Sequence, residues 1–155
     1  MRKPAIATVC LMMILIFAAP ADAALRVNMP DGTQINSDEI LLKNGRAYVD
    51  IDLFSHFDGV ITWPDFPYDH EPISSVAVLW QQNESRTTLI VVNKLTREVH
   101  ARAWGLIREG TRDLDVVIED NGVYLPLRAT AEFLGATVTY DPATDTATIT
   151  QPNFQ

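Results

Sequence analysis

The sequence predicts an α+β fold made of two related strand-helix-strand halves, with an antiparallel sheet packed on two short helices. Short runs of β-branched and other apolar residues alternate along the chain with turn signals such as Asn44-Gly45 and Asn121-Gly122. Two segments, 50–59 and 126–135, have the composition of short helices and lie 76 residues apart. A third observation, an export signal at the N-terminus, decides which residues belong to the fold.

The first 23 residues have the three parts of a secretory leader. A basic start is followed by an uncharged apolar run over residues 5–19, then by Pro20 and the small-residue site Ala21-Asp22-Ala23. These features predict a signal peptide, residues 1–23, that is cleaved after Ala23. The apolar run is shorter than the roughly 20 residues that a membrane span needs, so we expect no membrane insertion after cleavage. The alternative is that residues 1–23 stay attached as an uncleaved anchor. After cleavage we expect residues 24–155 to form a single domain.

The cysteine content and net charge of the expected mature domain indicate its location and exclude some classes of partner. Cys10, the one cysteine of the chain, lies in the predicted leader, so the mature chain has neither a disulfide nor a cysteine metal site. Without the leader the chain keeps 10 basic and 19 acidic residues, a net charge of −9. Because such a chain repels phosphate backbones and anionic membrane surfaces, we expect no nucleic-acid partner. We expect a secreted or extracytoplasmic protein of the bacterial cell envelope.

We expect short strands along the chain and one helix in each half. The expected strands are 40–42, 76–80, 88–92, 99–104, 116–118, 136–140 and 147–150. The clearer helix begins at Pro126, which is tolerated in a first helical turn, and Gly135 follows it where a left-handed cap is usual. The other helix, 50–58, begins with acidic residues and is followed by Gly59.

These two helical segments and their flanking strands share one pattern without a gap. The aligned pairs are Tyr48 and Tyr124, Phe57 and Phe133, and Gly59 and Gly135. Each copy has a turn, a strand that ends in tyrosine and an aliphatic residue, a helix, a glycine and a further strand. A spacing of 76 residues is too long for a solenoid, so we expect two repeats, about 25–75 and 88–150, packed into one domain. Coincidence between two short units is the alternative.

The second copy carries a specific family motif. Residues 121–129, 131–136 and 138–149 contain an Asn-Gly turn, a Tyr-Leu-Pro-Leu-Arg-Ala strand-helix junction, an Ala-Glu-Phe-Leu-Gly-Ala helix end and a final Thr-Ala-Thr-Ile strand. This segment resembles the copper amine oxidase N-terminal-like domain, or stalk domain, of secreted and cell-surface bacterial proteins. The first copy departs from it, with Asp50 in place of proline and Asp52 in place of arginine.

The resemblance implies a non-catalytic module. In copper amine oxidases the copper and the tyrosine-derived quinone belong to a different domain, so we expect no enzyme activity, no cofactor and no metal. The three histidines, His56, His70 and His100, are scattered, and the mature chain has no nucleophile motif. A binding or structural module of the cell envelope is the predicted function. The alternative is a small secreted enzyme that acts on cell-wall or extracellular glycans.

Two features are candidates for recognition. Arg128 matches the family's arginine, and it is expected either to bind a carboxylate or phosphate or, preferably, to pair with Glu132 one helical turn away. The stretch 62–72 is rich in proline and aromatic residues and is atypical of the family. Its aromatic residues Trp63, Phe66 and Tyr68 are the predicted contacts to an envelope protein or a glycan. Their alternative role is to cover the core.

Overall fold

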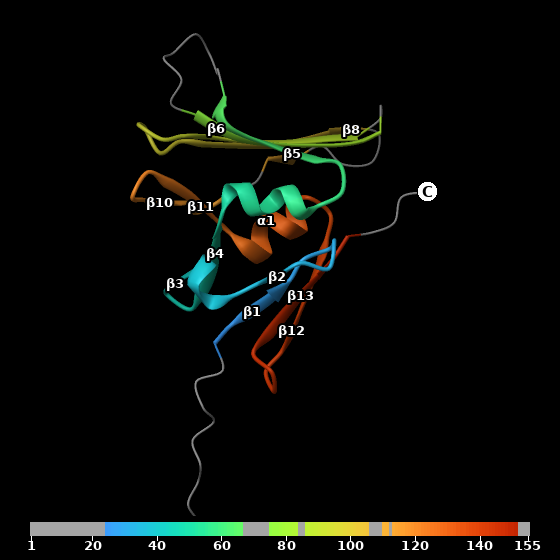
Figure 1. Cartoon of the computed structure of the whole chain (residues 1–155). Helices are drawn as coiled ribbons and strands as arrows, with labels where there is room; N and C mark the ends of the chain where they lie inside the picture. The colour runs from blue at the N-terminus through green and yellow to red at the C-terminus, as the bar shows by residue number, and fades with distance from the viewer. Residues whose placement is uncertain (1–23, 67–74, 84–85, 106–109, 112, 152–155) are drawn as a thin grey trace, which may run out of the picture.

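The computed structural model describes residues 24–66, 75–83, 86–105, 110–111 and 113–151 of the chain (Figure 1). The predicted leader, residues 1–23, lies outside the described residues. Across the described part the chain forms three β-sheets and one α-helix, α1, at Leu127–Phe133. No helix in this part is long and apolar enough to cross a membrane.

The predicted α+β class is wrong, because the molecule is mostly β. The expected sheet on two short helices is replaced by three sheets around α1 and a 3₁₀-helix, η2, at Ile51–His56. The α1 sequence, Leu-Arg-Ala-Thr-Ala-Glu-Phe, is rich in strong helix formers, whereas η2 reads Ile-Asp-Leu-Phe-Ser-His. Residues of the η2 kind have lower helix propensity, and short 3₁₀ segments are common where an α-helix is not favoured.

The central sheet joins two hairpins side by side in the order β10-β11-β4-β3. Its strands are β3 (Ile40–Lys43), β4 (Arg46–Asp50), β10 (Val117–Glu119) and β11 (Gly122–Pro126). Strands β4 and β11 are antiparallel, and Val49 faces Leu125 at the middle of the register. Both hairpin turns have two residues with positive φ, Asn44 and Gly45 in one and Asp120 and Asn121 in the other. This is the geometry of tight β-hairpin turns, which the turn signals predict.

One of the two other sheets combines strands from both ends of the chain, and the other is built from consecutive strands in its middle. The four-stranded sheet β12-β13-β1-β2 comprises β1 (Arg26–Asn28), β2 (Gln34–Ile35), β12 (Thr137–Asp141) and β13 (Thr146–Thr150). Its β1–β13 pairing is parallel, so the expectation of a purely antiparallel sheet is also wrong. The five-stranded antiparallel sheet comprises β5 (Val60–Phe66), β6 (Ser75–Asn83), β7 (Arg86–Asn93), β8 (Val99–Gly105) and β9 (Gly110–Thr111).

The core lies where the sheets enclose the two helical turns. Figure 1 shows α1 and η2 between the five-stranded sheet and the β12-β13-β1-β2 sheet. Phe54 of η2 is fully buried, and its ring lies 5.6 Å from that of Phe57. Val78 and Ile90 contribute from the inner face of the five-stranded sheet, and Leu125 contributes from the central sheet. Burial of these apolar side chains is the main favourable term in the stability of the fold.

The end of α1 is closed by a glycine cap, as the sequence predicts. Gly135 has a φ of 85°, in the left-handed region. Its N–H donates to the Glu132 carbonyl at 3.0 Å, and the Ala136 N–H donates to the Ala131 carbonyl at 2.9 Å. These two bonds form a Schellman motif that satisfies the last carbonyls of the helix.

Candidate functional site

A groove of about 1180 Å³ lies beside α1 and is the candidate binding site of this molecule. Its walls come from β3, β4, the segment 113–116, α1, β12, β13 and the turn between β7 and β8. Its lining residues are Leu25, Leu42, Gly45, Arg46, Ala47, Arg97, Val99, Asp113, Leu114, Asp115, Val116, Pro126, Leu127, Arg128, Ala129, Glu132, Val138, Tyr140, Asp145 and Ala147.

Part of the groove lining is apolar. Leu114, Leu127 and Ala147 are buried side chains of the hydrophobic core that also line the groove. Val116 and Val138 are half-buried and pack against the same core. A ligand in the groove would therefore meet apolar side chains interspersed with charged ones, and covering the apolar part would favour binding.

Two acids in the groove already have partners. The Asp115 carboxylate accepts a hydrogen bond from the Tyr48 hydroxyl at 3.0 Å and lies 3.6 Å from the Arg46 guanidinium. The Tyr140 hydroxyl donates to Asp145 at 2.6 Å, and this bond raises the pKa of Tyr140. Stabilising the protonated phenol keeps it as a donor to Asp145 over a wider pH range.

Two arginines that line the same groove have no partner among the described residues. Arg128, the second residue of α1, and Arg97 are exposed, and neither side chain has a hydrogen bond or ion pair within the described part of the chain. The ion pair expected between Arg128 and Glu132 is not found. Glu132 has another interaction, so it does not need Arg128 as its partner.

Arg97 is positioned by a hydrogen-bonded turn between β7 and β8. The Asn93 side-chain oxygen accepts from the backbone N–H groups of Leu95 and Thr96 at 2.9 and 3.0 Å. The Arg97 N–H donates to the Asn93 carbonyl at 2.9 Å, and Arg97 has a φ of 63°. The sequence does not single out Arg97, because its place in the groove depends on how β7 and β8 pack. Arg46 was also missed, although the Asn44-Gly45 turn signal directly precedes it.

The predicted aromatic contacts lie away from the groove. Trp63 is half-buried in β5, where it pairs with Ala77, and it has an interaction of its own. Phe66 is the last residue of β5 and follows an irregularity in the β5–β6 register, which includes Pro64. The side chain of Phe66 is outside the described part of the structure. Tyr68 also lies outside the described residues. Because β5 is an edge strand, its proline removes no required ladder hydrogen bond.

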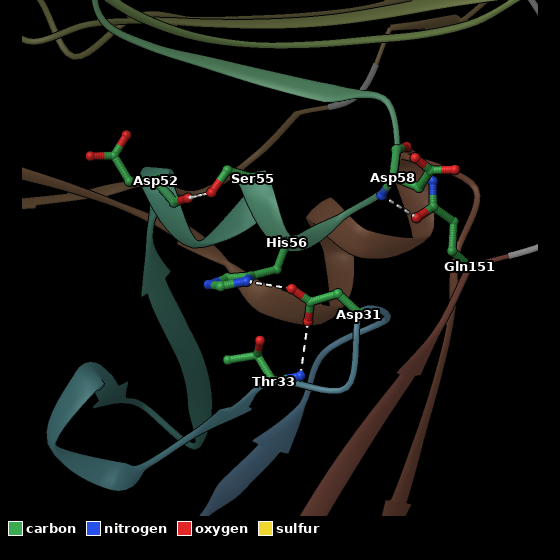
Figure 2. Close-up of polar contacts among 7 residues, drawn as sticks. All are labelled: Asp31, Thr33, Asp52, Ser55, His56, Asp58 and Gln151. Atoms are coloured by element: carbon green, nitrogen blue, oxygen red, sulfur yellow. Dashed lines mark hydrogen bonds and ion pairs between the residues drawn. The ribbon is translucent and has the colours of Figure 1, made fainter.

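A second polar cluster joins η2 to the first hairpin. Figure 2 shows the Asp31 carboxylate between the His56 ring, whose Nδ1 is 2.8 Å away, and the Thr33 N–H, 2.9 Å away. The bond from the Thr33 backbone, followed by that from His56, lowers the pKa of Asp31 to about 2. Nearby, the Gln151 side chain exchanges two hydrogen bonds of 2.8 Å with the backbone of Asp58. These contacts hold chain segments together.

One comparison with known proteins gives a match. Residues 108–155 match the family model of the copper amine oxidase N-terminal domain. The match confirms the family resemblance of the second copy, and the domain that this family model describes is a non-catalytic module. No match was found among curated proteins or among solved structures.

The residues that the structure describes do not fit a copper ion. Within residues 24–151, excluding the gaps given above, no three histidine, cysteine, aspartate or glutamate side chains are grouped so that they could hold a metal. His56 bonds to Asp31, His100 lies in β8, and His70 lies outside the described residues. Copper sites need several nitrogen or sulfur ligands in fixed geometry.

Proposed function

We propose that this chain is an exported, non-catalytic module of the bacterial cell envelope that binds a partner through the groove beside α1. The observation that carries the proposal is that most of the groove lining falls within residues 108–155, the segment that matches the non-catalytic domain. In this proposal residues 1–23 are removed on export, and residues 24–155 act as one domain.

The chemistry of the groove supports binding. Ligand sites are usually preformed concave surfaces that combine apolar side chains with polar groups, and the lining of this groove has both. The Arg46–Asp115 and Tyr140–Asp145 contacts join pairs of its lining residues. Trp63 is proposed as a separate contact point on β5, which a second partner surface could use.

The experiment compares capture by two matched tryptophan variants. Ala129→Trp places a large ring in the groove, whereas Ala143→Trp places the same ring in the exposed β12–β13 turn, where residue 143 does not line the groove. Purified mature protein is immobilised and incubated with solubilised envelope fractions, and the captured partner is identified and then titrated as a pure component. We expect Ala129→Trp to lose the partner and Ala143→Trp to retain it, with melting temperatures showing that both variants are folded.

Export is tested by the mass of the protein recovered outside the cytoplasm. We expect a mass that corresponds to residues 24–155. An intact residue 1–23 segment on the recovered protein would contradict export by cleavage, and equal capture by both tryptophan variants would contradict the groove as the binding surface.

A further inference from the structure

We propose that β12 is an interaction edge and that its partner is β12 of a second copy of this chain, paired antiparallel about Thr139. The pairing joins the two four-stranded sheets into one continuous sheet across a two-fold axis. It goes beyond the proposed function and does not depend on the groove having a ligand.

Strand β12 is an open edge of its sheet in the part of the chain that the structure describes. It stands at one end of the order β12-β13-β1-β2 (Figure 1), and its pairing with β13 runs from Thr137 to Asp141 without a register shift. Thr137, Thr139 and Tyr140 are exposed. The outward backbone N–H and C=O groups of an edge strand are a template for a further strand.

The other described edges of the three sheets have features that discourage such pairing. Strands β2 and β9 have two residues each, and β10 has three. Strand β3 ends in Lys43, and β5 is interrupted by Pro64 and a register shift. Short strands, lysine and proline are the usual means by which natural sheets block their edges. Strand β12, Thr-Val-Thr-Tyr-Asp, contains no lysine and no proline, and its first four residues are uncharged β-formers.

The sequence of β12 is complementary to itself in the antiparallel register centred on Thr139. The facing pairs are Thr139 with Thr139, Val138 with Tyr140, and Thr137 with Asp141. Threonine pairs and pairs of an aromatic with a β-branched residue stabilise antiparallel neighbours, and a threonine hydroxyl can donate to a carboxylate. Every residue of the strand is then paired, and no like charges face each other. A register centred on Val138 or Tyr140 leaves residues at one end of each strand unpaired.

Pairing about Thr139 brings the grooves of the two copies to one face of the joined sheet. Val138 and Tyr140 both line the groove, and because they are two residues apart they lie on the same face of β12. A two-fold axis perpendicular to the sheet keeps equivalent faces together, so Val138 of each copy packs beside Tyr140 of the other. Tyr140 is 49 % exposed in the single chain, and covering part of its ring favours the pair.

Net charge opposes the pair and gives it a characteristic salt dependence. The chain has a net charge of −8, so two copies repel each other as they approach. Salt screens this repulsion beyond about 8 Å at physiological ionic strength. A pair held by backbone hydrogen bonds and apolar contacts therefore strengthens as salt is added, whereas a pair held by ion pairs weakens. Because each copy contributes one short strand, the buried area is small and the dimer is weak.

The test is sedimentation equilibrium of the full mature protein at concentrations up to about 1 mM. We expect a reversible monomer–dimer equilibrium that shifts toward the dimer when sodium chloride is raised from about 50 to about 500 mM. At about 150 mM salt, Thr139→Lys and Thr139→Glu should each weaken the dimer about fivefold or more, because like charges then face each other at the two-fold axis. An equimolar mixture of these two variants should dimerise again, because opposite charges then face each other.

Thr150→Lys is the matched control variant. Thr150 is an exposed threonine on β13, one strand in from the edge, and it pairs with Thr137 on the sheet face that also carries Thr139. Thr150→Lys makes the same change in net charge as Thr139→Lys. We expect it to dimerise at least as well as the wild type, with melting temperatures showing that the variants are folded. The wild-type titration tests the pairing even where a variant fails to fold.

Four results would overturn the inference. They are a wild type that stays monomeric at about 1 mM, a dimer that salt weakens, an equal loss in Thr139→Lys and Thr150→Lys, and a mixture of the lysine and glutamate variants that stays monomeric. A monomeric wild type whose Thr139→Lys variant loses the captured envelope partner would assign the edge to an unlike strand, and would overturn a second copy as its occupant.

Discussion

Two buried threonine hydroxyls have no hydrogen-bond partner within the described part of the molecule. They are the side chains of Thr88 in β7 and Thr130 in α1, and both residues are 0 % exposed. A buried polar group without a partner loses its hydrogen bonds to water on folding and forms none within the protein. Each of these two hydroxyls is therefore expected to lower the stability of the fold.

We expect Thr130→Val to raise the free energy of unfolding by about 1 kcal/mol, because valine has nearly the shape of threonine and no hydroxyl to desolvate. The measurement is urea unfolding of the mature protein, with Thr137→Val on the exposed face of β12 as the control. A destabilised Thr130→Val variant would mean that the hydroxyl has a partner after all.

The lowered pKa of the Asp31 carboxylate predicts how the free energy of unfolding depends on pH. Its pKa is lowered from 3.8 to about 2 in the folded protein, first by the Thr33 N–H and then by His56. A lowered acid pKa stabilises the folded state fully above the unfolded value, and this contribution is lost as the pH falls through the folded value. The stability difference between wild type and Asp31→Asn should be constant above about pH 4 and should shrink between there and about pH 2.

Unfolding curves of the two proteins, recorded from pH 6 downward, test this dependence because the other acids titrate in both. A difference that stays constant to the lowest pH at which both proteins fold would show that Asp31 does not carry it. His56→Gln should reproduce part of the effect, since the ring is the second of the two contributions.

At the scale of the elements, the end of α1 depends on one backbone conformation. Gly135 has a φ of 85°, which side chains with a Cβ adopt at a cost, and a β-branched residue is least suited to it. Gly110 lies in β9, where it pairs with Ala103, and it is not one of the glycines with positive φ. Its sequence context, Arg-Glu-Gly-Thr, predicts an ordinary turn at Gly110, and the structure instead places this residue in a strand.

We expect Gly135→Val to lower the free energy of unfolding by more than about 1 kcal/mol, and Gly110→Val to have a smaller effect. Thermal unfolding of the two variants gives the comparison directly. Equal melting temperatures would contradict the role of Gly135 as a helix cap, whatever the size of the shift that both variants share.

At the scale of the whole molecule, the first and second parts of the chain are interleaved. Strand β1 pairs with β13, β4 pairs with β11, and β7 and β8 extend the sheet that begins with β5 and β6. Every sheet thus contains strands from both predicted repeats. The core between the sheets closes only when both parts are present, so neither part can bury its apolar face alone.

We expect fragments 24–83 and 84–155 to be unfolded separately and to regain the native amide spectrum when they are mixed. Each fragment lacks the pairing partners of β4 or β11 and leaves the core side chains Phe54 or Leu125 exposed. Nuclear magnetic resonance of the isolated and mixed fragments is the measurement. A dispersed spectrum from either fragment alone would show that the predicted repeats fold independently.

The sequence by itself determined the local features of the second half. The Asn121-Gly122 turn signal, the helix near 126–134, the Gly135 cap and the family motif each depend on a few neighbouring residues and on short hydrogen bonds. Such features can be read from a short segment because the backbone conformations they require are set within it. The first half was harder to predict, since its helical segment has weak helix formers and became the 3₁₀-helix η2.

Only the tertiary structure decided the fold class and the groove. The Asn28 side chain meets Thr148, 120 residues away, beside the parallel β1–β13 pairing, and no local pattern specifies that partner. Arg97 and Arg128 likewise come to one groove from separate elements. Pairings of this kind are selected by how much apolar surface the whole chain buries when its sheets close around the core, and that quantity is a property of the complete arrangement of strands.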